Sequence, residues 1–229
     1  MNHVCRFCGK SYVKESTLAA HLCEPKRRHQ QQNDWGVQLG FKAYLRFYEI
    51  TQGSAKLKTY EDFSSSPYYT AFVKYGWHTM AIRVVNFSSY TEWLLKNNKK
   101  LDNWCKDSLY LEWLCEYIKK ESVQDALERA LREMQDYADN DKNSKIQGNF
   151  SEYFSLGAPN RIVHHISTGR VSPWIVYNCG SGQGFLSKLN EEQVSMIMPW
   201  IDPDHWQRKF KDYAADTEWI KDILLGAGL

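Results

Sequence analysis

Apolar and polar residues follow a helical period along most of the chain after residue 34. The clearest example is segment 123–138, where apolar side chains recur three and four positions apart. Ser122 precedes it and Asp125 lies in its first turn, a capping-box arrangement in which side chains satisfy the free amides of a helix start. Ser-Pro or Asp-Pro pairs at 66–67, 172–173 and 202–203 precede other periodic stretches, and proline suits the first turn of a helix. The pattern therefore predicts a helical body.

The predicted helices cover residues 35–51, 67–85, 90–97, 107–120, 123–138, 160–167, 173–178, 183–189, 191–200, 203–213 and 217–225. The stretch "MAIRVVNF" at 80–87 is the best strand candidate, yet it continues a helical pattern. Segment 139–150 is polar and without period, so we expect a surface loop that divides the body into halves 31–138 and 151–229. The predicted fold class is mainly α, with a small ββα finger at 1–30 and an all-helical globular domain at 31–229.

Composition narrows the class of protein further. The 229 residues are 43% hydrophobic, which is enough to bury a sizeable core. No apolar run approaches the roughly 18 residues of a membrane span, and the polar start does not resemble a secretory signal. We therefore expect a soluble, cytoplasmic protein with no membrane partner. Three of the six cysteines cluster in the first 23 residues, which indicates metal ligands rather than a disulfide framework.

The cysteine cluster follows a metal-binding pattern. Two residues separate Cys5 from Cys8, and twelve residues separate Cys8 from His21. Tyr12 and Leu18 stand where a miniature core needs an aromatic and a leucine. This stretch of about 25 residues resembles the Cys2His2 zinc fingers, in which a β-turn holds two thiolates and a helix presents histidine. The expected cofactor is Zn²⁺, because so small a unit has too little core to fold without a metal.

The fourth ligand departs from this pattern. Finger proteins place it three to five residues after His21, where this chain has proline, lysine and arginine. The candidates are His29 and Cys23. His29 requires the chain to turn back, since eight helical residues rise about 12 Å. Cys23 requires the helix to end directly after His21, and Pro25 permits either path because the residue before a proline avoids the α region. The sequence leaves both candidates open.

Positive charge is concentrated on the finger. The chain has a net charge of +2, yet residues 1–30 alone hold six lysines and arginines against two glutamates. Such a balance favours contact with a polyanion, DNA above all. The base-facing positions of a docked finger would be Lys14, Thr17 and Ala20, and one finger covers about three base pairs. We therefore expect phosphate contacts to dominate the affinity. The candidate nucleic-acid-binding residues are Arg6, Lys10, Lys14, Lys26, Arg27 and Arg28.

Catalytic residues are harder to identify. His164 and His165 are adjacent, so on a helix they diverge by about 100° and only one can face a given site. His205 stands beside two aspartates, which are better explained as helix-capping and first-turn acids. These three histidines are the candidates for a catalytic site, but the pattern favours a protein without enzymatic activity.

A broader resemblance covers most of the chain. The segments "AHLCEPKRRH", "SPYYTAFVKYG", "LDNWCKDSLY", "DALERALREM" and "GRVSPWIVYNCGSGQGFL" resemble uncharacterised proteins of T4-like tailed bacteriophages in which a zinc finger precedes a helical body. The resemblance implies a host-cytoplasm setting and a role around phage DNA. We expect a zinc-dependent DNA-binding accessory protein whose body contacts replication, transcription or packaging proteins, or further nucleic acid. The alternatives are an enzyme that processes or modifies nucleic acid, targeted by its finger, and a virion or assembly adaptor with a structural zinc site.

Overall fold

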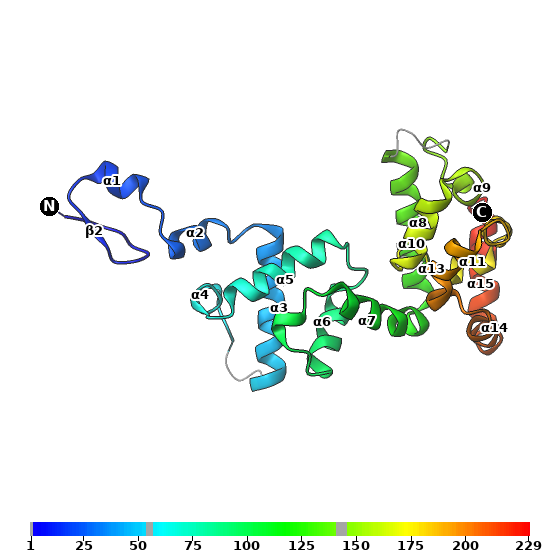
Figure 1. The fold of residues 1–229 in the computed structure, drawn as a ribbon, viewed down its shortest axis with the longest axis horizontal. Coiled ribbons are helices and arrows are strands. Elements are labelled where there is room, and N and C mark those ends of the chain that lie inside the picture. The colour runs from blue at the N-terminus through cyan, green and yellow to red at the C-terminus, as the bar shows by residue number, and fades with distance from the viewer. Residues whose placement is uncertain (1, 54–56, 141–145) are drawn as a thin grey trace. The chain divides into compact units, whose positions relative to one another are not determined.

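A computed structural model describes residues 2–53, 57–140 and 146–229, and these residues are mainly helical (Figure 1). Within them the only sheet is an antiparallel pair, β1 (His3–Val4) and β2 (Ser11–Tyr12), with His3 opposite Tyr12. The helix α1 (Glu15–Ala20) follows this pair. A small ββα finger before a helical body confirms the predicted fold class.

The chain forms two compact units that divide between Leu109 and Tyr110. The division therefore comes before segment 139–150, where we expected the body to separate into halves. Of that segment, α8 includes 139 and 140, and residues 141–145 lie outside the described residues.

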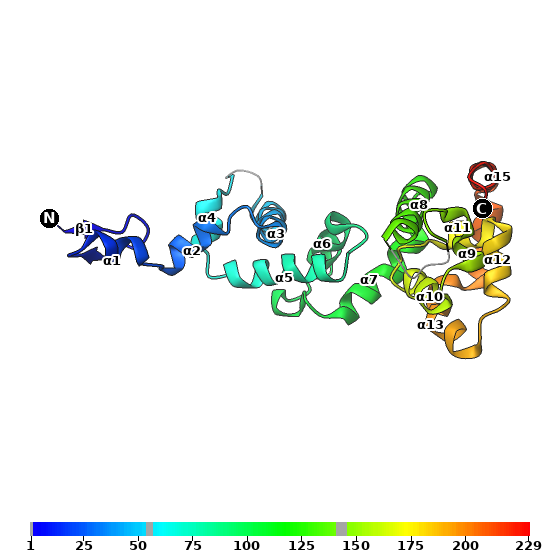
Figure 2. The same ribbon diagram turned by 90° about the horizontal axis from the view of Figure 1, so that it is seen from above.

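After the finger, the first unit contains α2 (Glu24–Gln30), α3 (Trp35–Gln52), α4 (Tyr60–Ser65), α5 (Tyr69–Ala81), α6 (Phe87–Lys96), the short 3-10 helix η1 (Leu101–Asn103) and the start of α7 (Asp107–Lys120). The closest contact is between α3 and α5, which Figure 2 shows with α3 nearly end-on. A methyl group on Gly76 would stand 1.9 Å from the carbonyl oxygen of Gly36. Glycine thus lets the two backbones approach, and buried aromatic rings such as Phe72 and Tyr75 fill the adjoining core.

The second unit contains the rest of α7 and α8 (Val123–Asn140), η2 (Phe150–Glu152), α9 (Tyr153–Leu156), α10 (Pro159–Ser167), α11 (Pro173–Asn178), α12 (Gly180–Leu186), α13 (Glu191–Ile201), α14 (Pro203–Asp212) and α15 (Ala214–Gly226). Its centre is α11, which is buried along most of its length and contacts α8, α12 and α15. The predicted apolar face of α8 is buried, with Ala126 and Ala130 fully covered. The amide of Asp125 donates to Ser122 Oγ at 3.1 Å, which confirms the predicted cap.

Several boundaries differ from the predicted ones. Helix α5 ends at Ala81 rather than 85, because Arg83 adopts a positive φ of 51° that a helix does not permit. No strand forms in 80–87, all of which the structure describes. Helix α12 begins at Gly180, three residues early, with Cys179 Sγ accepting from the Gly182 amide. The short helices α2, α4 and α9 lie where no helix was predicted.

Candidate metal centre

The finger brings two thiols together at the β1–β2 turn. The amide of Cys5 donates to the carbonyl of Lys10 at 2.9 Å, and the amide of Gly9 donates to the carbonyl of Cys5 at 2.8 Å. Gly9 adopts a φ of +72°, a conformation that glycine accepts without strain. The turn thereby points Cys5 and Cys8 toward α1, the helix that leads to His21.

Four side chains converge at this point: Cys5, Cys8, His21 and Cys23. Their ligand atoms all lie within 4.8 Å of one another. The Sγ atoms of Cys5 and Cys23 are 3.9 Å apart, and Cys8 Sγ lies 3.3 Å from His21 Nε2. A tetrahedral ion with metal–sulfur bonds of about 2.3 Å would separate two thiolates by about 3.8 Å. Three thiols and one imidazole at these spacings therefore fit a closed, four-coordinate metal site.

A break between two helices places Cys23 in the group. Helix α1 ends at Ala20, and His21 already has an extended backbone with ψ 123°. Cys23 is also extended and is the N-cap residue of α2, which has Pro25 in its first turn. The ammonium of Lys26 donates to the His21 carbonyl at 2.9 Å and stabilises this bend. The chain thus leaves the helical path directly after His21, which is the condition under which Cys23 can reach the site.

The other candidate for fourth ligand lies elsewhere. His29 is near the end of α2, and its ring packs against Phe7 with 5.1 Å between centroids. It does not belong to the group of convergent donors. The structure therefore assembles Cys5, Cys8, His21 and Cys23, and the set that ends in His29 is not brought together.

Neighbouring groups favour the metal-binding forms of His21 and Cys5. Tyr12 lies 2.7 Å from His21 Nδ1, so with Nε2 at the cluster the Nδ1–H group donates to the hydroxyl. Such an outer hydrogen bond orients a ligating histidine and fixes its tautomer. Hydrogen bonds from the backbone amide of Phe7 first, and then from the amide of Cys8 and the thiols of Cys8 and Cys23, lower the pKa of Cys5 to about 7 against the effect of burial. This lowering favours the thiolate that a metal requires.

The six basic residues of the predicted nucleic-acid surface have different environments. Arg6, Lys10 and Lys14 are exposed side chains of the finger. Lys26 is half-buried and is held by the His21 carbonyl, and Arg27 forms an ion pair with Glu24. Arg28 is only 19% exposed in its side chain. The finger thus presents three cations to solvent, while those of α2 also make contacts within the protein.

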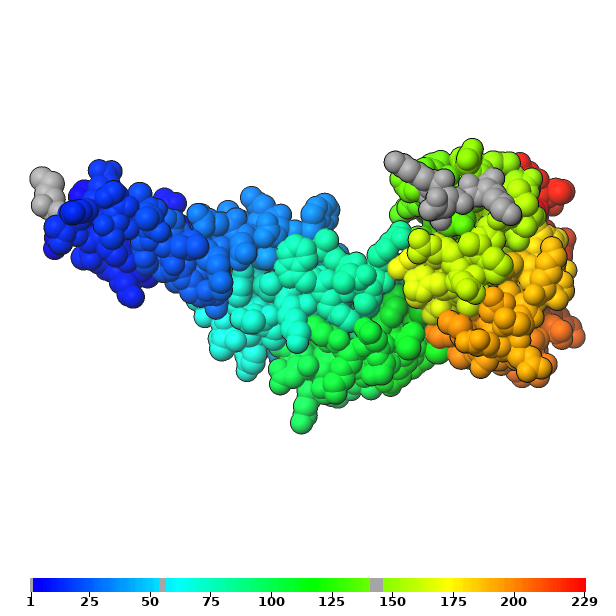
Figure 3. Space-filling model, turned by 45° about the horizontal axis from the view of Figure 1, so that its top comes forward, coloured from blue at the N-terminus to red at the C-terminus, as the bar shows by residue number. Residues whose placement is uncertain are grey.

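Arg28 attaches α2 to the helices of the first unit. Its guanidinium donates to the carbonyl of Ser64 and lies 4.3 Å from the centre of the Tyr69 ring. The hydroxyl of Tyr60 donates to the Arg28 carbonyl at 2.8 Å. In Figure 3 the surface of the finger continues through α2 onto the cyan region of α4. Because Cys23 is the N-cap residue of the same helix, only five positions separate it from Arg28, which makes this attachment.

The three candidate catalytic histidines lie in separate settings. His165 is 3% exposed, and its Nδ1 lies 2.7 Å from the Tyr153 hydroxyl while its Nε2 faces Glu133 at 3.4 Å. His164 is exposed on the other side of α10. His205 is half-buried on α14 and lines a cavity of about 940 Å³ in the second unit, together with residues that include Lys119, Trp174 and Lys209. Within the described residues the only convergent group of metal-ligand type is the one in the finger.

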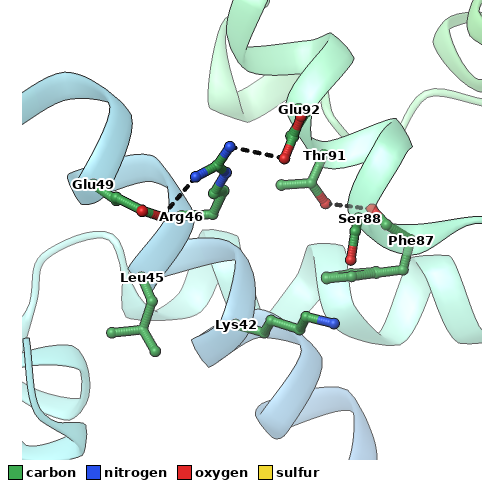
Figure 4. Close-up of a pocket in the computed structure, with 8 residues that line it drawn as sticks. All are labelled: Lys42, Leu45, Arg46, Glu49, Phe87, Ser88, Thr91 and Glu92. Atoms are coloured by element: carbon green, nitrogen blue, oxygen red, sulfur yellow. Dashed lines mark hydrogen bonds and ion pairs between the residues drawn. The ribbon is translucent and has the colours of Figure 1, made fainter. Parts of the chain in front are cut away.

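The first unit also contains a small pocket between α3 and α6 (Figure 4). Its volume is about 250 Å³. Figure 4 shows Arg46 between two carboxylates, Glu49 at 2.7 Å and Glu92 at 2.8 Å, while the ammonium of Lys42 lies 5.6 Å from the Phe87 ring centre. The Arg46 guanidinium is already neutralised by these two carboxylates, so the lining does not indicate a charged ligand.

Comparison with known proteins identifies no relative: no family model, no curated protein and no solved structure matches the chain. The resemblance to phage proteins therefore stays a prediction. In the described part of the chain, none of the helices has the length and apolar character needed to cross a bilayer.

Proposed function

We propose that the protein binds DNA through a finger that a structural Zn²⁺ holds together. Cys5, Cys8, His21 and Cys23 would be the ligands, and the single observation that carries the proposal is their convergence within 4.8 Å beside three exposed cations. A closed set of four protein ligands leaves no open coordination position, which is typical of structural rather than catalytic zinc. The metal would supply folding free energy to a unit that has almost no core.

The geometry of α1 supports contact with the major groove. The helix begins at Glu15, so Lys14 stands immediately before it and Thr17 and Ala20 fall on the positions that face bases in docked fingers. All three side chains are exposed. Only Lys14 can make a strong contact to a base edge, so Arg6, Lys10 and Lys14 would act mainly on phosphates. The proposed binding is thus largely independent of sequence.

The first unit would supply further contacts beside the DNA-bound finger. Arg28 attaches α2 to the first unit, so a finger bound to DNA would bring that unit with it. Trp35 and Trp77 are 75% and 47% exposed on the first unit, and tryptophan is a residue type that is enriched in protein interfaces. We propose that this unit contacts a protein partner or further nucleic acid while the finger holds the DNA.

The test measures the affinity for a labelled duplex over a series of salt concentrations. Each phosphate contact contributes about 0.9 to the slope of log affinity against log salt. A variant with Arg6, Lys10 and Lys14 replaced by methionine should lower the slope by about two to three units. The matched control replaces Lys188, Lys211 and Lys221, which are exposed on the second unit, by methionine and should leave it unchanged. Equal slopes in both variants, or binding that survives zinc chelation, would contradict the proposal.

A further inference from the structure

Two exposed tryptophans come from adjoining positions on α3 and α5 of the first unit. Trp35 is the first residue of α3, and Trp77 stands in the second half of α5. The close contact between these helices places the Trp77 ring against Gly36, the residue that follows Trp35. We refer to Trp35 and Trp77 together as the tryptophan surface.

Gly36 supports one face of the Trp77 ring. A methyl group on Gly36 would lie 2.3 Å from Cδ2, 2.5 Å from Cε2 and 2.6 Å from Cγ of Trp77. Cδ2 and Cε2 are the carbons that the two rings of the indole share, so the backbone of α3 approaches the middle of the ring and not its edge. Trp77 is nevertheless 47% exposed, so its open part is the face turned away from α3.

An indole held in this way is suited to stacking. A base can stack on the open face, and the contact with the α3 backbone has already removed most of the side-chain freedom that binding would cost. A tryptophan that anchors a protein partner instead fills a pocket on that partner. The Trp77 ring lies flat on its own protein, so it does not project far enough to fill a pocket. Its geometry therefore favours a flat ligand such as a nucleobase.

The charge of the first unit favours the same class of ligand. Residues 1–109 contain sixteen lysines and arginines against nine aspartates and glutamates, a balance of +7, whereas residues 110–229 contain thirteen against eighteen, a balance of −5. Lys74 is exposed one turn before Trp77 on α5, where its ammonium can reach the phosphate of a stacked nucleotide. Asp34 stands beside Trp35, so the phosphate would lie on the Lys74 side.

A short connection joins the tryptophan surface to the finger. Only residues 31–34 separate the end of α2 from Trp35. The amide of Gln32 donates to the His29 carbonyl at 3.4 Å, and the amide of Asp34 donates to the Gln31 carbonyl at 3.0 Å. The helix that Arg28 attaches to α4 and α5 therefore leads directly to the first of the two tryptophans.

We propose that the tryptophan surface stacks unpaired bases, so that the preferred ligand is a DNA duplex with a single-stranded segment. The inference rests on the proposed contact between the finger and DNA, and it adds the kind of DNA that the protein would hold. The cations of the finger would contact the paired part. Trp77 would stack a base whose phosphate meets Lys74, and Trp35 would offer a second ring. Because every base has a π-face, we expect no sequence preference.

The experiment compares the affinity of the zinc-loaded full chain for a blunt duplex and for the same duplex with a single-stranded tail of about ten nucleotides. The wild type should bind the tailed duplex about tenfold more tightly. Trp77→Leu should remove most of this advantage, whereas Trp77→Phe should keep it because a phenyl ring still stacks. The matched control is Trp219→Leu, since Trp219 is 43% exposed on the second unit, and it should keep the full advantage.

Trp35→Leu provides an independent measurement. Trp35 is 75% exposed and has little packing to lose, so this variant should fold, and it should reduce the advantage of the tailed duplex in the same direction. Equal affinity of the wild type for the two duplexes would overturn the proposal. So would an advantage that survives in Trp77→Leu, or in Trp35→Leu where Trp77→Leu does not fold, and the surface would then be left to a protein partner.

A single-stranded oligonucleotide with the sequence of the tail separates this proposal from that of the finger. The variant that lacks Arg6, Lys10 and Lys14 should still bind this oligonucleotide at low salt, and the binding should weaken further in Trp77→Leu. Loss of salt-dependent duplex binding together with such Trp77-dependent binding would contradict the finger proposal alone. Duplex binding that depends on the finger cations, without any effect of Trp77→Leu on the single strand, would overturn this proposal alone.

Discussion

Replacing Cys23 by serine should remove most of the metal affinity of the finger. The apparent free energy of zinc binding in small structural sites is about 10–16 kcal/mol, so one of four ligands contributes about 3–4 kcal/mol. That corresponds to a loss of two to three powers of ten in affinity. In the structure Cys23 Sγ lies 3.9 Å from Cys5 Sγ, and a serine oxygen is a poor substitute because zinc in such sites prefers thiolate and imidazole.

His29→Gln is the matched variant. His29 lies on the same short helix, and its ring contacts Phe7 rather than the donor group. Its loss removes one exposed ring contact, worth about 1 kcal/mol or less, and leaves all four donors in place. We therefore expect zinc affinity within about fivefold of the wild type.

The assay is competition for zinc against a coloured chelator, followed by cobalt substitution. Thiolate-to-cobalt charge-transfer absorption scales with the number of bound thiolates, so Cys23→Ser should lower it by about one third and His29→Gln should leave it unchanged. Release of zinc from His29→Gln with retention in Cys23→Ser would refute the reasoning. Retention in both variants would show that the site closes with another group.

Three other predictions follow from packing and charge. Arg28→Met should lower the free energy of unfolding of the first unit by about 1–3 kcal/mol, because the guanidinium contacts to α4 and α5 are lost. The control Arg27→Met, at an exposed position, should change it by less than about 0.5 kcal/mol, and chemical denaturation of the zinc-loaded protein measures both. Gly76→Ala should cost about 3 kcal/mol, since its methyl group would meet a backbone carbonyl of α3 at 1.9 Å, while Gly226→Ala, with open space around it, should be neutral or slightly stabilising; equal melting temperatures would contradict the close approach of α3 and α5. Burial lowers the pKa of His78, so the unfolded chain binds more protons than the folded one near pH 6.5 and stability falls as the pH drops through that value; His78→Gln should reduce the fall, and an identical fall would show that another group causes it.

Much of the fold could be predicted because its causes are local. The periodic face of α8 and its cap at Ser122 depend only on neighbours within one turn, and both agree with the structure. Helix α2 was missed because its sequence has no apolar period, although Pro25 stands in its first turn and Glu24 forms ion pairs with Arg27 and Arg28. Its support comes from Tyr60 and Tyr69, more than thirty residues away, to which Arg28 is attached.

Part of the candidate metal site could likewise be predicted from local sequence. Cys5, Cys8 and His21 follow from spacing, since Tyr12 places a ring beside the histidine and the turn brings the thiols together. The cavity of the second unit gave no sequence signal, because Lys119, Trp174 and Lys209 come from three helices that meet only after folding.

By itself, therefore, the sequence determined a mainly helical protein whose first 23 residues hold a Cys/His set that could bind a metal, because period, caps and ligand spacing act over a few residues. Only the tertiary structure decided between Cys23 and His29. Pro25 permits the chain to bend in either way. In the structure α1 ends at Ala20, which brings Cys23 Sγ to 3.9 Å from Cys5 Sγ. Helix α2, which Arg28 attaches to α4 and α5, carries the His29 ring to Phe7 instead. The same contacts occupy Arg28, a residue whose charge alone predicted a phosphate contact.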